Sequence, residues 1–229
     1  MLNASPLDIS PGIRLWSGAL DADKQKSLVE DVMRRAADAP FYRPTMPRSG
    51  KPFSVEETNF GSLGWLSDTN GYRYETNHPQ TQRPWPAMPE LLPELWRDAT
   101  GYRAPPECCL VNLYRAGARM GLHQDRDEQA FDAPVLSVSL GDDALFRIGG
   151  TTRRGPSVNV KLSSGDVLVF GGPARLAFHG IDRLMSGSSQ LVPGGGRINL
   201  TLRRVKSPAP WKPHALEPKT HKKDARPGG

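Results

Sequence analysis

The sequence predicts a mainly β domain with flanking helices (α+β), built as an antiparallel sandwich or jelly roll. Three observations predict this class. Short segments with an apolar period of two follow one another after residue 107, and turn signals separate them. Glycine and proline are abundant, with 23 and 22 among 229 residues, which favours many turns between short strands. Helical periodicity is confined to two segments, which excludes a helical bundle.

The first part of the chain contains one predicted helix. Residues 1–16 indicate an extended lead-in. Apolar residues then recur at three- and four-residue spacing from Leu20, with Asp21 available as the N-cap, until Pro40 ends the helix. Residues 41–88 are rich in Pro, Gly, Asn, Thr and aromatics and lack long periodic runs, so they predict short hairpins and loops.

A second helix is predicted over residues 89–100. Pro89 suits the first helical turn, and Gly101 can end the helix in the left-handed conformation, whereas Pro93 counts against it. The period then changes from 3.6 to 2. Strands are predicted at residues 108–115, 119–123, 134–140, 144–149, 157–162, 166–171, 175–179 and 197–204.

The charge and the cysteine content indicate which binding partners and which cell compartment to expect. Thirty basic against 24 acidic side chains give a net charge of +6 and a pI near 9.5, which favours a polyanionic partner such as nucleic acid. The two cysteines, Cys108 and Cys109, are adjacent, so a disulfide framework is excluded. No apolar run reaches the roughly 18 residues of a membrane span, and no segment resembles a secretory signal. We therefore expect a cytoplasmic protein with no membrane partner.

Two histidines and one aspartate form a candidate metal site. His123 and Asp125 are two residues apart, so on a strand both side chains leave the same face. His179 ends another predicted strand. Two imidazoles and one carboxylate on a rigid sheet form a facial triad, a ligand set that suits non-haem Fe(II). An H-x-D pair occurs by chance in many proteins, so this hypothesis depends on further support.

That support comes from the predicted strand that follows the second histidine. Strict alternation places Arg197, Asn199, Thr201 and Arg203 on one face. A solvated outer face is one interpretation of this pattern. The other is that two guanidinium groups bind the two carboxylates of a dicarboxylic acid, and beside a metal triad that acid is 2-oxoglutarate. On an earlier strand, Asn112 and Tyr114 repeat the spacing; the full polar set is Asn112, Tyr114, Arg197, Asn199 and Arg203.

Seven motifs in chain order then point to a family. They are TNFGSLGW, NGYRYE, HPQTQRPWPAMP, VNLYRAGARMGLHQDRDE, PVLSVSLGDDALFRIGG, SSGDVLVFGGPARLAFHGI and RINLTLR. Together they resemble the AlkB-type Fe(II)- and 2-oxoglutarate-dependent dioxygenases, which reverse alkylation damage in nucleic acids. The resemblance runs from about Thr58 to Arg204. It implies a double-stranded β-helix, that is a jelly roll, with an N-terminal lid over the metal.

The resemblance also implies a domain organisation. Residues 1–204 would form one dioxygenase domain, in which about 1–88 are an N-terminal extension with the nucleotide-recognition lid and 89–204 are the jelly-roll catalytic core. The first 57 residues carry little of the family signature. Residues 205–229 are rich in Pro and Lys and predict a flexible basic tail, which either attracts phosphates or only solubilises the chain.

Site residues follow from the resemblance. His123, Asp125 and His179 would hold the metal, Arg197 would bind the distal carboxylate of 2-oxoglutarate, and Arg203 would lie near its metal-chelating carboxylate. Asn112, Tyr114 and Asn199 would complete the cosubstrate site. Substrate contacts are implied for five further residues, with a stacking tryptophan and an aspartate that reads the base edge; these are Trp65, Tyr72, Tyr74, Asp127 and Arg153. Without the resemblance, Trp65 would pass for a core aromatic and Asp127 for a solvated acid.

The implied function is direct-reversal repair by oxidative demethylation. With Fe(II), O2 and 2-oxoglutarate, N-alkylated bases such as 1-methyladenine and 3-methylcytosine would be restored, with release of formaldehyde, succinate and CO2. The expected partner is single-stranded DNA, with double-stranded DNA and RNA left open, and the expected state is a monomer. Two rivals remain: an AlkB-type enzyme for a tRNA modification or a protein side chain, and a non-enzymatic jelly-roll nucleic-acid binder.

Overall fold

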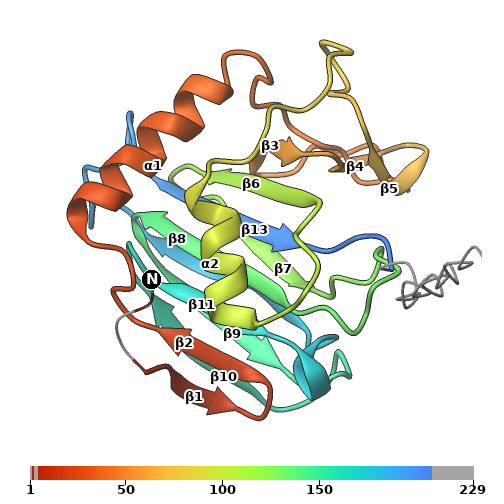
Figure 1. Cartoon of the computed structure of the whole chain (residues 1–229). Helices are drawn as coiled ribbons and strands as arrows, with labels where there is room; N and C mark the ends of the chain where they lie inside the picture. Colours follow the sequence, from red (N-terminus) through yellow and green to blue (C-terminus); the bar gives the residue numbers. More distant parts are fainter. Residues whose placement is uncertain (1, 3–4, 208–229) are drawn as a thin grey trace, which may run out of the picture.

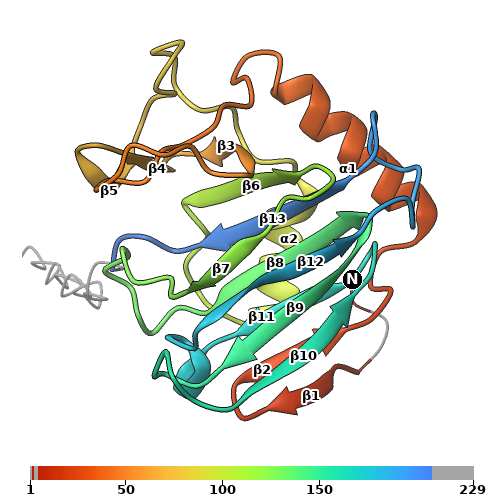
Figure 2. The same cartoon turned by 180° about the vertical axis from the view of Figure 1, so that it is seen from behind.

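The computed structural model describes residue 2 and residues 5–207, so most of the tail predicted at 205–229 lies outside the described residues. Two antiparallel sheets face each other (Figures 1 and 2). The larger sheet has the strand order β1-β2-β11-β8-β13-β6-β3. Its strands are β1 (Leu7–Ser10), β2 (Ile13–Trp16), β3 (Glu56–Gly61), β6 (Cys108–Tyr114), β8 (Val135–Gly141), β11 (Val167–Phe170) and β13 (Arg197–Arg203).

The smaller sheet has the order β10-β9-β12-β7 and lies in front in Figure 2. Its strands are β7 (Met120–His123), β9 (Asp143–Gly149), β10 (Ser157–Leu162) and β12 (His179–Met185). The two sheets together form the predicted jelly roll, because from β6 to β13 the chain passes back and forth between them, apart from the β9–β10 hairpin within the smaller sheet. Apolar side chains from both sheets form a core between them, for example Val135, Phe146, Ile148, Leu168 and Phe170.

Two helices cover the outer face of the larger sheet (Figure 1). In α1 (Ala22–Arg35) the side chain of Asp21 caps the N-terminus by accepting a hydrogen bond from the backbone of Lys24, as predicted. In α2 (Leu91–Thr100) Gly101 ends the helix with a φ of 64°, also as predicted. Pro93 is tolerated because it lies in the first turn, where a backbone N–H has no helical partner. Leu28, Val32, Leu92, Leu95 and Trp96 pack on this sheet.

A separate hairpin, β4 (Gly64–Asp68) and β5 (Gly71–Glu75), follows β3 and projects beside the open end of the two sheets (Figures 1 and 2). Hairpins were predicted for this region. No helix within the described residues is long and apolar enough to span a membrane.

Several predicted elements differ from the structure. The first helix ends at Arg35, before Pro40, and the second begins at Leu91, so Pro89 precedes it. The extended lead-in forms the β1–β2 hairpin, which joins the larger sheet through β11. The strand predicted at 175–179 is wrong: a 3-10 turn (Gly172–Ala174) lies before it, and the strand β12 begins only at His179. Its physical reason is that Arg175 is drawn inward, where its guanidinium group donates to the carbonyls of Ala133 and Asp125.

Candidate active site

Register between two strands brings the histidines together. In the pairing of β7 with β12, His123 lies directly opposite His179, and their ring centroids are 4.4 Å apart. Asp125 follows β7 by two residues, and its carboxylate oxygens lie 3.8 Å from Nε2 of His123 and 3.9 Å from Nε2 of His179. The three ligand atoms lie within 4.8 Å of one another. The predicted triad is therefore one spatial cluster.

Both imidazoles are oriented for binding a metal. Nδ1 of His179 lies 2.9 Å from the carbonyl oxygen of Ala177, and Nδ1 of His123 lies 3.1 Å from that of Gly121. A ring that donates from Nδ1 has its lone pair on Nε2. Burial, reinforced by His123, lowers the pKa of His179 to about 4, so this ring is neutral at physiological pH. Neutral imidazole is the form that coordinates metals.

Asp125 is held as a buried carboxylate by Arg203. The guanidinium group of Arg203 donates to both carboxylate oxygens, at 2.7 and 3.1 Å. Burial by itself raises the pKa of Asp125, but Arg203 and the two histidines outweigh it and hold that pKa below its usual range. The backbone carbonyl of Asp125 also accepts a hydrogen bond from Arg175 at 2.7 Å. Asp125 is thus fixed at both its side chain and its backbone.

A buried network that the sequence analysis did not identify supports this arrangement. Glu128 forms an ion pair with Arg175 at 3.1 Å and lies 3.6 Å from Arg203. It also accepts a hydrogen bond from the hydroxyl of Tyr74. Glu128 follows Asp125 by three residues in the same motif, and this closeness in the sequence could have pointed to it. Its partners, however, come from distant segments of the chain. Tyr74, which was predicted to contact the nucleotide, lies on the hairpin, and its hydroxyl is held in this network by Glu128 and Arg203.

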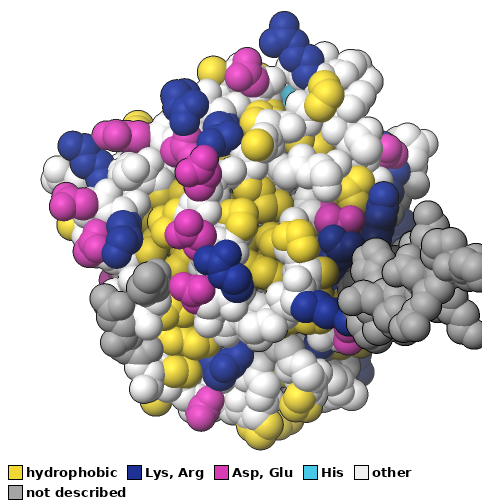
Figure 3. Space-filling model, in the orientation of Figure 1, with side chains coloured by type: hydrophobic (Ala, Val, Ile, Leu, Met, Phe, Trp, Pro, Cys, Tyr) yellow, Lys and Arg dark blue, Asp and Glu magenta, His cyan; other side chains and the backbone are white. Residues whose placement is uncertain are grey.

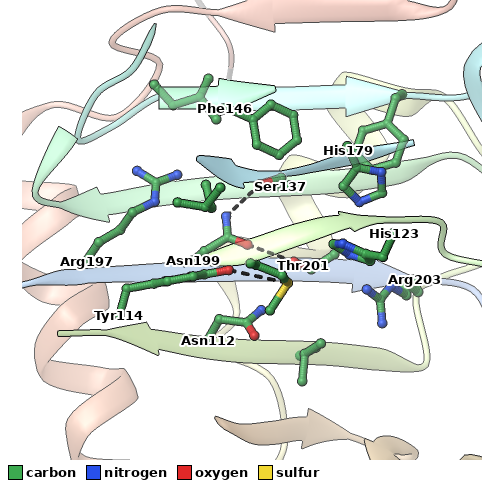
Figure 4. Close-up of a pocket in the computed structure, with 16 residues that line it drawn as sticks. Asn112, Tyr114, His123, Ser137, Phe146, His179, Arg197, Asn199, Thr201 and Arg203 are labelled. Atoms are coloured by element: carbon green, nitrogen blue, oxygen red, sulfur yellow. Dashed lines mark hydrogen bonds between the residues drawn. The ribbon is translucent and has the colours of Figure 1, made fainter. Parts of the chain in front are cut away.

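A pocket between the sheets extends from His123 and His179, the two histidines of the triad, to Arg197, as Figure 4 shows. Arg197 is 0% exposed, yet among the described residues its guanidinium group bonds only to the hydroxyl of Ser139 at 2.7 Å and to the carbonyl of Asp142 at 3.5 Å. Its Nε has no partner in the described part of the chain. Burial lowers the pKa of Arg197 to about 10, which still leaves it charged. A buried cation with an orphaned donor is suited to an anionic ligand.

The other predicted cosubstrate residues line the same pocket. Asn112, Tyr114, Asn199 and Arg203 project into it from β6 and β13 (Figure 4). The hydroxyl of Tyr114 has only a weak contact of 3.7 Å with the sulfur of Met120. The pocket therefore offers a charged group at each end and polar groups between them, which fits a dicarboxylate such as 2-oxoglutarate, while the triad fits Fe(II).

The predicted base-contacting residues lie on the hairpin and near the triad. Trp65 on β4 stacks on Tyr72 of β5, with ring centroids 5.4 Å apart at an interplanar angle of 19°. Its indole N–H donates to Asp127 at 2.9 Å. Tyr72 is 50% exposed. Arg153 lies apart from these residues, exposed in a loop with its guanidinium group 5.9 Å from the ring of Phe178.

Comparisons with known proteins agree with this geometry. The family described as the 2OG-Fe(II) oxygenase superfamily matches residues 12–203. An alpha-ketoglutarate-dependent dioxygenase AlkB homolog of Caulobacter vibrioides (strain NA1000 / CB15N) is 58% identical over 206 residues, or 89% of this chain and 92% of that protein. The alpha-ketoglutarate-dependent dioxygenase AlkB of Escherichia coli (strain K12) is 43% identical over 79% of this chain and 84% of that protein. The solved structure of OsALKBH1 matches with a TM-score of 0.76 at 30% identity, over 87% of this chain and 99% of that one.

Proposed function

This chain belongs to the 2OG-Fe(II) oxygenase superfamily and, within it, to the AlkB-type dioxygenases, and we propose that its substrates are 1-methyladenine and 3-methylcytosine in single-stranded DNA. Its activity is oxidative demethylation of a nucleic acid, with Fe(II), 2-oxoglutarate and O2. The observation that carries the proposal is a His-Asp-His triad whose two histidines line one pocket with a buried arginine that lacks an anionic partner among the described residues.

We assign the metal to His123, Asp125 and His179. Once bound, Fe(II) with 2-oxoglutarate and O2 supplies the oxidation of the N-methyl carbon, which leaves as formaldehyde while 2-oxoglutarate becomes succinate and CO2. The chain positions these reactants. Hydrogen bonds from Nδ1 would leave Nε2 of both histidines free to bind the metal, and Arg203 keeps Asp125 ionised. These three residues would leave the remaining coordination positions of the metal to the cosubstrate and O2.

The cosubstrate would lie along β6 and β13. Arg197 would pair with its distal carboxylate, because this guanidinium group has unused donor capacity in a fully buried position. The hydroxyl of Tyr114 would exchange its weak sulfur contact for a carboxylate oxygen. Asn112 and Asn199 would supply amide groups between the ends, and Arg203 would face the carboxylate nearest the metal.

The alkylated base would bind under the β4–β5 hairpin, which we propose acts as the lid. Trp65 would stack on the base against His123, and Asp127 would accept a hydrogen bond from the exocyclic amine of adenine or cytosine. Tyr72 and Arg153 are exposed and would contact the neighbouring nucleotides or phosphates. The helix-covered face intermixes acidic and basic side chains around apolar surface (Figure 3), so it offers no continuous positive track for a phosphate backbone.

The test begins with binding and ends with product. Fe(II) and 2-oxoglutarate are first titrated under anaerobic conditions, and O2 is then admitted with a single-stranded oligonucleotide that carries one 1-methyladenine or 3-methylcytosine. We expect formaldehyde and succinate in equal amounts from the methylated oligonucleotide. We expect no lesion-dependent formation of either product with the unmethylated oligonucleotide or with the His179→Ala variant. Matched double-stranded DNA and RNA oligonucleotides rank the substrates. Faster turnover of the RNA, or of a methylated tRNA, would overturn the assignment to single-stranded DNA.

A further inference from the structure

A row of polar side chains crosses the inner face of the larger sheet beyond the cosubstrate pocket. Successive register partners connect five residues, from the segment before β3 to β8: Tyr42 pairs with Glu57, Glu57 with Asn112, Asn112 with Asn199, and Asn199 with Ser139. Directly opposed residues in a sheet project from the same face. Asn112 and Asn199 line the cosubstrate pocket, so Glu57 occupies the next position outward in the same row.

Strand alternation confirms which way Glu57 points. Phe60 on β3 packs in the core cluster on the helix side, so Glu57, an odd number of residues away, faces the interior between the sheets. The backbone N–H and C=O of Glu57 both bond to Tyr42, at 2.7 and 3.0 Å. Opposite Asn112, Glu57 therefore occupies a non-hydrogen-bonded pair, the type in which opposed side chains lie closest.

Three consecutive members of this row have polar atoms without a partner. Both carboxyl oxygens of Glu57, the hydroxyl of Tyr42 and Oδ1 of Asn112 are enclosed and make no hydrogen bond within the described structure. Glu57 itself is 0% exposed. These groups have too few hydrogen-bond donors if Glu57 is ionised. An ionised carboxylate only accepts, so the hydroxyl of Tyr42 would be the single donor for three acceptors, the two oxygens of Glu57 and Oδ1 of Asn112. One additional proton on Glu57 balances the group.

We propose that Glu57 is a positioning residue, held as a neutral carboxylic acid that accepts a hydrogen bond from Tyr42 and donates one to Oδ1 of Asn112. The donated bond fixes the amide of Asn112 with its nitrogen toward the cosubstrate, the orientation seen in Figure 4. This inference rests on the proposed contact between Asn112 and 2-oxoglutarate. A neutral Glu57 also avoids placing a second buried anion beside a dicarboxylate.

The surrounding charges agree with this protonation state. Burial raises the pKa of Glu57 to about 8, against the opposing effect of Arg203 on β13. Among the described residues, the phenols of Tyr42 and Tyr114 also interact electrostatically with Glu57, and burial raises the pKa of both above their usual range, so they stay protonated. Glu57 is thus the member of this group that can change its charge between pH 7 and 9.

The test compares two replacements of Glu57 with a matched control. Glu57→Gln keeps a donor and an acceptor without charge, Glu57→Met keeps the length but removes both, and Glu56→Gln alters the neighbouring acid on the opposite face. The dissociation constant of 2-oxoglutarate is measured by calorimetry on Fe(II)-loaded protein under argon at pH 7, and the melting temperature is recorded for each variant. We expect wild-type affinity for Glu57→Gln and Glu56→Gln, and a loss of about 3- to 10-fold for Glu57→Met, the range of one net hydrogen bond.

A pH series completes the test and does not depend on the stability of Glu57→Met. We expect the affinity of the wild type for 2-oxoglutarate, relative to Glu57→Gln, to fall as the pH rises through 8. A Glu57→Gln affinity as weak as that of Glu57→Met, or parallel pH curves for the wild type and Glu57→Gln, would overturn the neutral-acid role. A wild-type affinity for 2-oxoglutarate in Glu57→Met would show that Glu57 has no role in cosubstrate binding. Normal 2-oxoglutarate binding in Asn112→Ala would instead refute the proposed contact at Asn112.

Discussion

The indole nitrogen of Trp65 donates a hydrogen bond of 2.9 Å to the carboxylate of Asp127. This contact joins the β4–β5 hairpin to the loop that carries Asp125, so the stacking residue and the edge-reading residue of the proposed base site are one structural unit. The stack of Trp65 on Tyr72 holds the ring from its other side. Substitutions at Trp65 and Asp127 are therefore expected to be coupled.

The first prediction concerns this pair. Asp127→Ala should slow repair of 1-methyladenine and 3-methylcytosine more than that of 3-methylthymine, which has no exocyclic amine. Trp65→Phe, which keeps a ring but loses the N–H that orients Asp127, should show the same bias to a smaller extent. Trp65→Ala should cost about 1 to 3 kcal/mol of stacking, or roughly 5- to 150-fold in kcat/KM. Equal slowing of all three lesions by Asp127→Ala would contradict edge reading.

The second prediction concerns Asp125. Its replacement by Ala should abolish turnover and Fe(II) binding, because it removes one of three ligands, and His123→Ala and His179→Ala should do the same. Asp125→Ala alone should also leave Arg203 buried without its principal partner, at a cost of about 3 to 5 kcal/mol. Urea unfolding of the metal-free proteins measures this difference. Similar unfolding midpoints for Asp125→Ala and His123→Ala would argue against the structural importance of the ion pair.

The third prediction concerns Arg197. Arg197→Met should raise the KM for 2-oxoglutarate strongly, since truncating one partner of a buried charged pair costs about 2 to 5 kcal/mol. The ligand-free protein should lose little stability, because Arg197 bonds only to a hydroxyl and a carbonyl within the described chain. Titration with 2-oxoglutarate and thermal unfolding without it check the two halves. An unchanged KM would mean that the distal carboxylate binds elsewhere.

The fourth prediction concerns Gly180, which follows His179 on β12. A Cβ at this position would lie 2.4 Å from the carbonyl oxygen of Met120 and 2.8 Å from that of Gly121, both backbone atoms of β7. Gly180→Ala should therefore push β7 and β12 apart and separate the two histidines. We expect weakened Fe(II) binding in a protein that still folds, as measured by metal titration and circular dichroism. Gly187→Ala is unsuitable as a control because its φ is 81°, whereas Gly150→Ala meets no atom within 4 Å.

The fifth prediction concerns stability against pH. In the unfolded chain Glu57 ionises near its ordinary value of 4.5, whereas burial raises its pKa to about 8 in the folded protein. The folded state therefore binds the extra proton between these values, and its stability falls as the pH rises through this window. Glu57→Gln has no such pH dependence. Its free energy of unfolding, relative to that of the wild type, should therefore rise by up to about 1.4 kcal/mol per pH unit and level off above pH 8. Parallel urea midpoints from pH 5 to 8 would contradict the raised pKa.

Much of the fold and of the candidate metal site could be predicted because it depends on local sequence patterns, such as apolar periodicity, helix caps and residue spacing. The period of two indicated most strands of the jelly roll, and the caps at Asp21 and Gly101 bounded the helices. The two-residue spacing of His123 and Asp125 predicted one site, although β7 ends at His123 and Asp125 lies two residues beyond it. His179 was the proposed third ligand because it ends another predicted strand, and the family resemblance supported that assignment.

Tertiary structure decided the rest, because the deciding contacts join segments far apart in the chain. Arg203 and Asp125 are separated by 78 positions, and Arg175 reaches Glu128 across 47. The burial of Arg175 also replaced the strand predicted at 175–179 with a turn, since the cost of an unpaired buried charge outweighs strand propensity. Glu57 is the clearest case. The sequence pattern of residues 41–88 did not single out Glu57, and only the register of β3 against β6 places its carboxyl in a closed interior beside Asn112.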